Sequence, residues 1–151
     1  MKKADKITLV MNYLINIRHF STNVTKQVQE DFSKTDINCS EAFYLILLNE
    51  NKDGLTLSEL SSLTKVDKSL TTRIVKKLME KEYVYKDTND LSSRNYKIKL
   101  TFSGLKKAEK IDDVLVEKYD SFISKYTEEE ITLMNKAFKI LLDNDKNGKE
   151  I

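Results

Sequence analysis

Apolar residues recur every three or four positions over the start of the chain. This spacing predicts one long amphipathic helix over about 5–32, because an α-helix completes a turn in about 3.6 residues. The helix's apolar positions are Ile7, Val10, Met11, Leu14, Ile17, Phe20, Val24 and Val28. A break is expected at 33–38, and Asn38 or Ser40 can cap the next helix, which is apolar on most sides. We expect that second helix to be the buried centre of the fold and Gly54 to end it in a left-handed conformation.

Two short helices joined by a tight turn are expected next. Thr56 and Glu59 have the spacing of a capping box, in which each side chain bonds to the other residue's backbone N–H. The turn is expected at 64–66, and Asp67 or Ser69 can cap the helix that follows. That helix is expected to reach about Glu82, with an apolar stripe of Leu70, Ile74, Val75, Leu78 and Met79. The pattern is that of a helix-turn-helix.

From Tyr83 onward the apolar period changes to two. Residues 83–86 and 96–100 alternate between the two faces of a strand, and the turn-forming residues 87–95 predict a hairpin loop between them. Thr101 or Ser103 can cap a long helix after the hairpin.

A last amphipathic helix begins at a further capping box, Thr127 to Glu130. The expected fold is therefore mainly α with a minor β component, a winged helix-turn-helix with a small β-wing. We expect a single domain over 1–151, whose lobe at 40–102 is flanked by dimerisation helices at 5–36 and 103–143, with a flexible tail at 144–151.

Charge is distributed unevenly along the chain. The net charge is only +2, so the total does not demand a nucleic-acid partner. Between Asp67 and Lys99, however, nine cationic residues stand against five acidic ones. From Ser103 to the end, nine lysines stand against eleven acidic residues. The basic excess is thus local to the predicted helix-turn-helix and hairpin.

Composition excludes several classes of protein. The chain has no Pro and three Gly, with 40% hydrophobic and 33% charged residues, which is typical of a soluble, mostly helical fold. No apolar run approaches the roughly 18 residues that cross a bilayer, and we expect no signal peptide and no membrane partner. The single Cys39 fits a reducing cytoplasm. Nucleophile motifs, phosphate-binding Gly loops and metal-ligand spacings are missing, so we expect no enzyme, cofactor or metal.

The second helix of the pair carries the residue types that contact DNA. Ser69, Thr72, Arg73 and Lys76 follow the i, i+3, i+4, i+7 spacing and share one face, suited to the major groove. The amides at the start of the first helix can hold a phosphate, and an Arg at the hairpin tip suits the minor groove. The expected DNA-binding residues are Thr56, Ser58, Lys68, Ser69, Thr71, Thr72, Arg73, Lys76, Lys77, Arg94, Asn95 and Lys97.

Two alternatives compete with this interpretation. The cationic and hydroxyl side chains could form an ordinary solvated helix face, although the helix-turn-helix spacing and the hairpin argue against this. The chain could also be a winged-helix protein-interaction module without operator specificity. Exposed Ser and Thr on the helix argue against that alternative, because a docking helix would expose apolar anchors.

The segment LTLSELSSLTKVDKSLTTRIVKKLMEKEYV resembles the helix-turn-helix of the MarR family of winged-helix transcriptional regulators. In that family an L-T-x-x-E-L-A opening leads to a D-K-S-x-x-T-R-x-V-x-x-L-E-x-K run. RNYKIKLTFSG resembles the family segment that closes the wing. The residues on or close to these patterns are Asp67, Lys68, Ser69, Thr72, Arg73, Val75, Leu78, Glu80, Lys81, Leu100, Thr101 and Gly104.

The resemblance implies a homodimer joined through its first and last helices. It also implies double-stranded DNA as partner, with a pseudo-palindromic operator, and repression that a ligand or oxidant relieves. Two positions depart from the family pattern. Ser92 stands where the wing usually has an Asp that holds Arg94, a role that Asp90 could take over. Glu82 replaces the usual Gly, which should cost about 1 kcal/mol at a left-handed helix end.

Candidates for sensing remain open. An effector of small aromatic or lipophilic type, as the resemblance implies, could bind a cleft between the dimer helices and the lobe. The expected lining residues are Tyr13, His19, Phe20, Phe43 and Tyr44, with ordinary core or structural roles as the alternative. Cys39 at a helix start could sense oxidants, because a helix N-terminus lowers a thiol pKa, or could be a plain small residue. The reactive Cys of such family members generally lies in the first helix.

Overall fold

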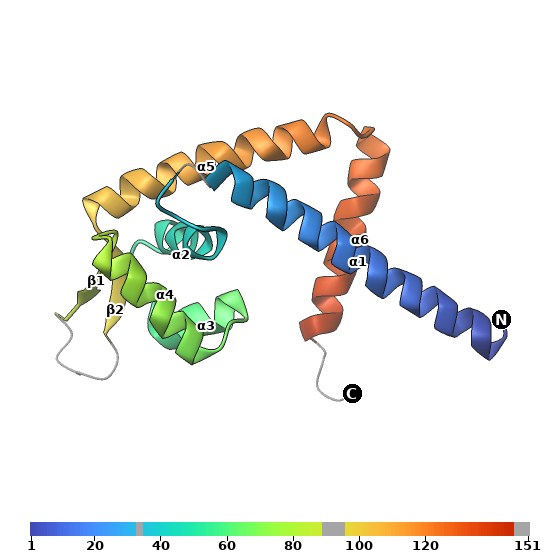
Figure 1. Ribbon diagram of the computed structural model, residues 1–151, viewed down its shortest axis with the longest axis horizontal. Helices are drawn as coiled ribbons and strands as arrows, with labels where there is room; N and C mark the ends of the chain where they lie inside the picture. The colour runs from blue at the N-terminus through green and yellow to red at the C-terminus, as the bar shows by residue number, and fades with distance from the viewer. Residues whose placement is uncertain (33–34, 89–95, 147–151) are drawn as a thin grey trace. The chain divides into compact units, whose positions relative to one another are not determined.

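The computed structural model describes residues 1–32, 35–88 and 96–146, with side chains up to residue 140. The chain forms two compact units, Met1–Ile111 and Asp112–Ile151. Its elements (Figure 1) are α1 (Lys3–Phe32), α2 (Cys39–Glu50), α3 (Leu57–Thr64), α4 (Lys68–Glu80), β1 (Val84–Asp87), β2 (Lys97–Leu100), α5 (Phe102–Ile123) and α6 (Glu128–Lys146). The expected helical fold with a small two-stranded wing is confirmed.

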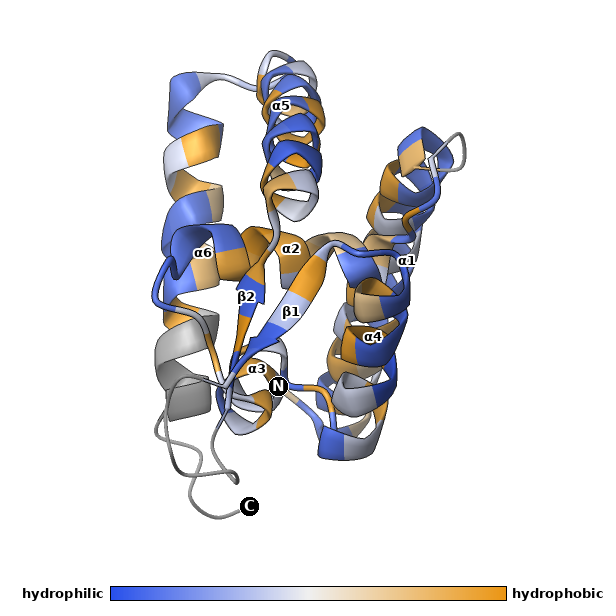
Figure 2. Cartoon of the chain, turned by 90° about the vertical axis from the view of Figure 1, so that its left-hand side faces the viewer, coloured by the Kyte–Doolittle hydropathy of each residue, from blue (hydrophilic) through white to orange (hydrophobic). Residues whose placement is uncertain are grey.

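Helix α2 is the centre of the lobe, as its apolar sequence predicts. It packs against α1, α3, α4 and β2, and Figure 2 shows it mostly in the hydrophobic colour. Tyr44, Leu45 and Leu48 are buried. The helix starts with a capping box: Asn38 Oδ1 accepts from Glu41 N–H at 2.9 Å, and Glu41 Oε2 accepts from Asn38 N–H at 3.0 Å. Asn38, rather than Ser40, is therefore the cap.

The two strands pair antiparallel, with Val84 opposite Leu100. Leu55 adds a short bridge to the free side of β2, where Ile98 N–H donates to Leu55 O at 2.7 Å. The turn before this bridge needs Gly54, which has φ +83°, and an added Cβ would lie 2.8 Å from Ile98 O. Helix α2 ends at Glu50 with Asn51 as its C-cap, so Gly54 has the expected left-handed conformation but does not end the helix. It lies in the following turn, where it lets the backbone of β2 approach closely.

Helix α4 ends two residues earlier than expected, and Glu82 takes the left-handed position with φ +60°. Tyr83 N–H donates to Leu78 O at 3.0 Å and Glu82 N–H to Met79 O at 2.9 Å. These two bonds define a Schellman motif, in which Gly is the favoured residue. A side chain at this position costs about 1 kcal/mol relative to Gly.

The start of α5 is tied to the end of α4. Gly104 N–H donates to Thr101 Oγ1 at 2.9 Å, so Thr101 rather than Ser103 caps the helix. Thr101 Oγ1 also donates to Glu82 O at 2.7 Å. A Cβ on Gly104 would lie 1.9 Å from Tyr83 O. Only glycine therefore fits where the two helices meet the first strand.

The terminal helices leave most of their apolar side chains on the surface. Of the 30 residues of α1, only Phe32 is buried. In α6, which begins at the expected Thr127–Glu130 capping box, Leu133 and Phe138 are exposed. These helices are amphipathic, and none of the helices that the structure describes is long and apolar enough to cross a membrane.

Candidate nucleic-acid interface

The N-terminus of α3 is closed by the expected capping box. Glu59 N–H donates to Thr56 Oγ1 at 3.2 Å, and Thr56 N–H donates to Glu59 Oε2 at 2.7 Å. That backbone hydrogen bond lowers the pKa of the Glu59 carboxyl. Ser58 is exposed and Thr56 is half-buried. Because an ionised carboxylate sits at this helix end, it disfavours a phosphate on the free amides there.

The turn between α3 and α4 is held by side-chain bonds to the backbone. Lys65 ends α3 in the left-handed conformation, with φ 56°. Val66 N–H donates to Ser61 O at 3.3 Å, and Ser61 Oγ donates back to Val66 O at 2.5 Å. These bonds set the direction in which α4 leaves the turn.

Asp67 caps α4, since its Oδ1 accepts from Leu70 N–H at 2.9 Å. Ser69, the other candidate cap, is exposed and free of that role. Ile74, Val75 and Leu78 are buried on one side of the helix. The opposite side presents four cationic and two hydroxyl side chains, which we call the α4 face: Lys68, Ser69, Thr72, Arg73, Lys76 and Lys77, all exposed.

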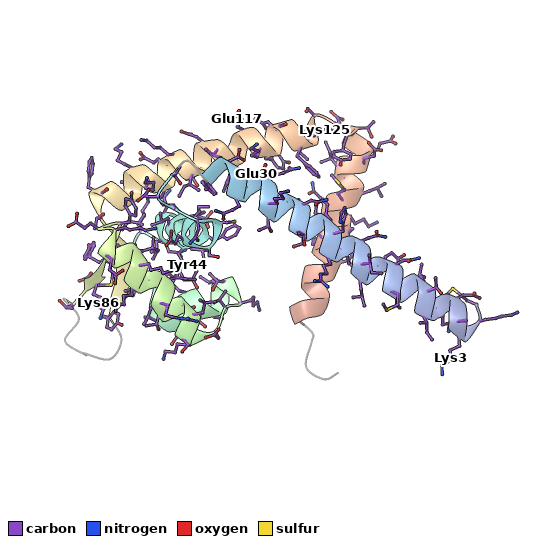
Figure 3. All side chains as sticks on the ribbon, viewed as in Figure 1. Lys3, Glu30, Tyr44, Lys86, Glu117 and Lys125 are labelled. Atoms are coloured by element: carbon purple, nitrogen blue, oxygen red, sulfur yellow. The ribbon has the colours of Figure 1, made fainter. Side chains whose placement is uncertain are left out.

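Thr71 does not lie on the α4 face, and its expected contact with DNA is wrong. Its exposed fraction is 0%, and its Oγ1 lies 2.9 Å from the hydroxyl of Tyr44. Figure 3 labels Tyr44, which reaches α4 from α2. Residue 71 precedes Ile74 and Val75 by three and four positions, so it belongs to the buried stripe. That spacing was visible in the sequence.

The wing adds exposed cations. Lys97, an expected DNA contact, is exposed, and so is Lys86, which the sequence analysis did not select. Lys86 Nζ lies 4.4 Å from the ring centroid of Tyr96 (Lys86 is labelled in Figure 3). The sequence feature that could have identified Lys86 is its exposed position in a strand whose side chains alternate between two faces. The expected contacts Arg94 and Asn95, and also Asp90 and Ser92, lie outside the described residues.

Lys99 has a different role in the wing. Its Nζ lies 2.8 Å from Asp87 Oδ2 on the neighbouring strand, and this bond raises the pKa of Lys99. The pair joins β2 to β1.

The five residues expected to line an effector cleft are not brought together in the chain. Phe43 and Tyr44 line a hollow of about 390 Å³ between α2, α3 and α4. We call this the helix hollow, and its other lining residues are Ser40, Ile46, Leu47, Leu63, Thr64, Val66, Leu70 and Ile74. Tyr13, His19 and Phe20 lie exposed on α1, where His19 Nε2 is 3.0 Å from Asn23 Nδ2. Within one chain, Phe43 and Tyr44 therefore line a hollow inside the helix-turn-helix that does not include Tyr13, His19 or Phe20.

The described part of the chain offers little for redox or metal chemistry. Cys39 is buried at the start of α2, and desolvation raises the pKa of its thiol. A raised thiol pKa favours the interpretation of Cys39 as a plain small residue. Among the described residues, no group of three or more His, Cys, Asp and Glu side chains could hold a metal ion.

A tight pair of helices followed by a two-stranded wing defines a winged helix-turn-helix protein. The profile of the MarR family matches residues 37–95, the segment that holds α2 to the wing. Over this segment, which is less than half of the chain, the chain is similar to the MarR family. Proteins of this family are transcriptional regulators.

Individual proteins show the same similarity. The HTH-type transcriptional regulator BilQ of Clostridioides difficile is 33% identical over 85 residues, which is 55% of each chain. The match thus spans about half the length of that curated relative. A solved MarR protein from Peptoclostridium difficile has 26% identity and a TM-score of 0.81, over 90% of this chain and 88% of that chain. The DNA complex of MepR from S. aureus shares the fold at 22% identity, with a TM-score of 0.80 over 87% and 96%.

Proposed function

We propose that this protein is a homodimeric, sequence-specific DNA-binding regulator that represses transcription in the cytoplasm. The α4 face carries the proposal, because its four cations and two hydroxyls are exposed together on a helix that a turn and a wing hold in place. Cations on such a helix bind phosphates, and Arg and Lys read guanine edges in the major groove. The neighbouring MepR structure, which contains DNA, supports the same use of the fold.

The α4 face also argues against a module that only docks proteins. Hot spots for protein docking are built from large apolar or aromatic anchors. Leu70 is the most exposed apolar residue among the described side chains of α4, and it lines the helix hollow. The α4 face itself presents only cationic and hydroxyl side chains.

Helix α1 supports the proposed dimer. Its exposed apolar positions follow helical spacing along one stripe, which includes Ile7, Val10, Leu14 and Ile17, each more than half exposed. Contiguous apolar surface of this kind marks an interaction site. A second copy of the chain can cover it, and a two-fold axis would then place two α4 helices about one DNA turn apart on a pseudo-palindrome.

The test is selection of duplexes by the full-length protein from a random pool. We expect an enriched pseudo-palindromic sequence whose affinity falls steeply with salt. Arg73→Ala should weaken binding to that duplex by about 1–3 kcal/mol. Lys110→Ala, an exposed cation on α5, is the matched control and should bind normally.

Two outcomes would contradict this proposal. A pool without any enriched sequence would favour the protein-interaction module. Normal binding by Arg73→Ala would remove Arg73 from the interface. Repression is tested separately, since deleting the gene should raise transcription from promoters that carry the selected sequence.

We further propose that a small aromatic or lipophilic effector binds the helix hollow. Its volume of about 390 Å³ lies in the range of small-molecule pockets, and the polar groups of its lining, Ser40, Tyr44 and Thr64, are neutral hydroxyls. Nile red, a neutral apolar dye, should bind the wild type and weaken its hold on the selected duplex. Leu63→Trp should fill the hollow and abolish dye binding, whereas Leu133→Trp on α6 should not. Equal dye binding by Leu63→Trp would place the effector elsewhere.

A further inference from the structure

Lys81, at the C-terminal cap of α4, is turned away from DNA recognition and into the lobe. Its Nζ lies 2.7 Å from Glu41 Oε2 on α2 and also donates to the backbone carbonyl of Asp36. Lys81 lies on the family pattern, yet the α4 face does not include it. A cation at the end of the DNA-binding helix is therefore used inside the protein.

Glu41 gives this contact its strength. Its side chain is 2% exposed, and the oxygen that binds Lys81 also accepts from Asn38 N–H at 3.0 Å in the capping box of α2. One buried carboxylate thus joins the start of α2 to the end of α4. Removing the cation alone leaves a buried charge without a partner, which is strongly unfavourable.

Asp36 extends the contact to two further elements. Its Oδ2 accepts from the Tyr83 hydroxyl at 2.7 Å, and its Oδ1 lies 2.8 Å from Lys107 Nζ on α5. The bond from Lys107 lowers the pKa of the Asp36 carboxyl, so this group stays ionised at neutral pH. We call the five residues Asp36, Glu41, Lys81, Tyr83 and Lys107 the polar clamp.

The polar clamp spans the segments whose relative position decides how α4 is presented. It connects the link between α1 and α2 with both ends of the wing, since Tyr83 precedes β1 and Lys107 lies on the first turns after β2. The cap at Asp67 and the hydroxyl pair of Thr71 and Tyr44 hold the other end of α4. The helix is thereby fixed at both ends.

We propose that Lys81 and Glu41 are positioning residues for DNA binding: their ion pair sets the orientation of α4 against α2 without touching DNA. The inference rests on the proposed DNA-binding function. A binding constellation keeps its geometry only when surrounding contacts hold it within a fraction of an ångström. Loss of the pair therefore shifts all six side chains of the α4 face by a small distance, which breaks directional hydrogen bonds to bases while the cations stay close to the phosphates.

The test compares Lys81→Met with Lys77→Met, using the duplex that the wild type selects from a random pool. Lys81→Met should lower the affinity for that duplex by roughly tenfold or more. The slope of log affinity against log salt should stay unchanged. Lys77→Met, which removes an exposed cation of the α4 face, should reduce the slope by about one. Lys81→Arg should restore part of the affinity, because it keeps the cation.

A second variant separates positioning from stability. Glu41→Gln with Lys81→Met removes both charges and keeps the acceptor that caps α2, so thermal stability should return toward that of the wild type. The affinity for the selected duplex should stay low, since the link between α2 and α4 is still missing. This double variant also serves if Lys81→Met alone does not fold.

Three results would overturn the inference. The first is wild-type affinity in either the folded Lys81→Met protein or the double variant, which would leave the pair only a structural role. The second is an affinity loss accompanied by a reduced salt slope, which would make Lys81 a direct phosphate contact. The third is a loss of affinity by the same factor for the selected duplex and for random duplexes. A failure of the proposed function looks different, because the wild type itself would then select no sequence.

Discussion

The lobe from α2 to β2 and the long helix α1 treat their apolar side chains in opposite ways. In the lobe, Leu45, Leu60, Leu78 and Ile98 are fully buried within one chain. In α1, the apolar stripe is on the surface and Phe32 alone is buried. Because apolar burial is the main favourable term in folding, the lobe has its stabilising contacts within the chain. The α1 stripe is not covered by the described residues of the chain, and we propose that a second copy covers it.

The polar groups follow the same division. The lobe joins distant parts of the sequence through side chains, as the Tyr44–Thr71 pair and the polar clamp show. The side-chain hydrogen bonds from Thr8 to Ala4 and between His19 and Asn23 of α1 stay within about one turn of the helix. The lobe is therefore specified by its own long-range contacts, whereas α1 is specified as a helix and little more.

The largest expected effect comes from a substitution in the apolar stripe of α1. Leu14, which is 58% exposed in one chain, should be buried in the dimer, where a carboxylate would lack a partner. Leu14→Glu should therefore give a monomer in sedimentation equilibrium, with duplex affinity lowered by about a hundredfold or more because one half-site is lost. The far-ultraviolet circular dichroism spectrum of the variant should still show that the lobe is folded.

Asn12→Glu is the control for that experiment, since residue 12 lies on the opposite face of α1. It adds the same charge and should remain dimeric. A dimeric Leu14→Glu protein would show that the α1 stripe serves another partner.

A smaller effect tests the tight packing of the lobe. Gly104→Ala places a Cβ 1.9 Å from Tyr83 O, a contact that the backbone must move to relieve. The free energy of unfolding in urea should fall by about 1–3 kcal/mol or more. Ser103→Ala, at the exposed neighbouring position, should stay within about 0.5 kcal/mol of the wild type. Equal stability of the two variants would mean that α5 can move away from the wing without lowering the free energy of unfolding.

The smallest effect distinguishes the two sides of α4. Thr71→Val removes the nearer of the two hydroxyl partners of the buried Tyr44 hydroxyl, the other being Thr64 at 3.4 Å. It should lower the free energy of unfolding by about 1 kcal/mol, with duplex affinity nearly unchanged. Thr72→Ala, on the exposed side, should have the opposite effects. Urea denaturation should show a nearly unchanged free energy of unfolding, and duplex titration should show a lowered affinity. The assignment of Thr71 to the core fails if Thr71→Val lowers affinity but keeps stability.

The order and type of the elements could be predicted from the sequence, and so could most of the α4 face. Helical spacing, the capping boxes at Thr56 and Thr127 and the change to period two at Tyr83 are local signals. Local signals suffice because each depends on residues within about one turn or one strand. The choice of Asn38, Asp67 and Thr101 among the candidate caps needed the structure, since two residues at each helix start could serve.

Contacts between distant residues could not be predicted from spacing. The spacing of Thr71 from Ile74 and Val75 indicates burial, but its hydrogen bond to Tyr44, 27 residues away, could not be predicted from spacing. Phe43 and Tyr44 were grouped with α1, yet they line a hollow with α3 and α4. Lys81 matched a family pattern without a role until Glu41, 40 residues away, was found beside it.

The sequence by itself determined that this protein is a winged helix-turn-helix with a cationic helix and long amphipathic ends, because periodicity, capping and local charge are properties of neighbouring residues. The tertiary structure alone decided which side chains of α4 are exposed, where the helix hollow lies and what holds α4 in place. Those questions depend on side chains that approach across the fold, and their geometry arises only when α2 packs against α3, α4 and the wing.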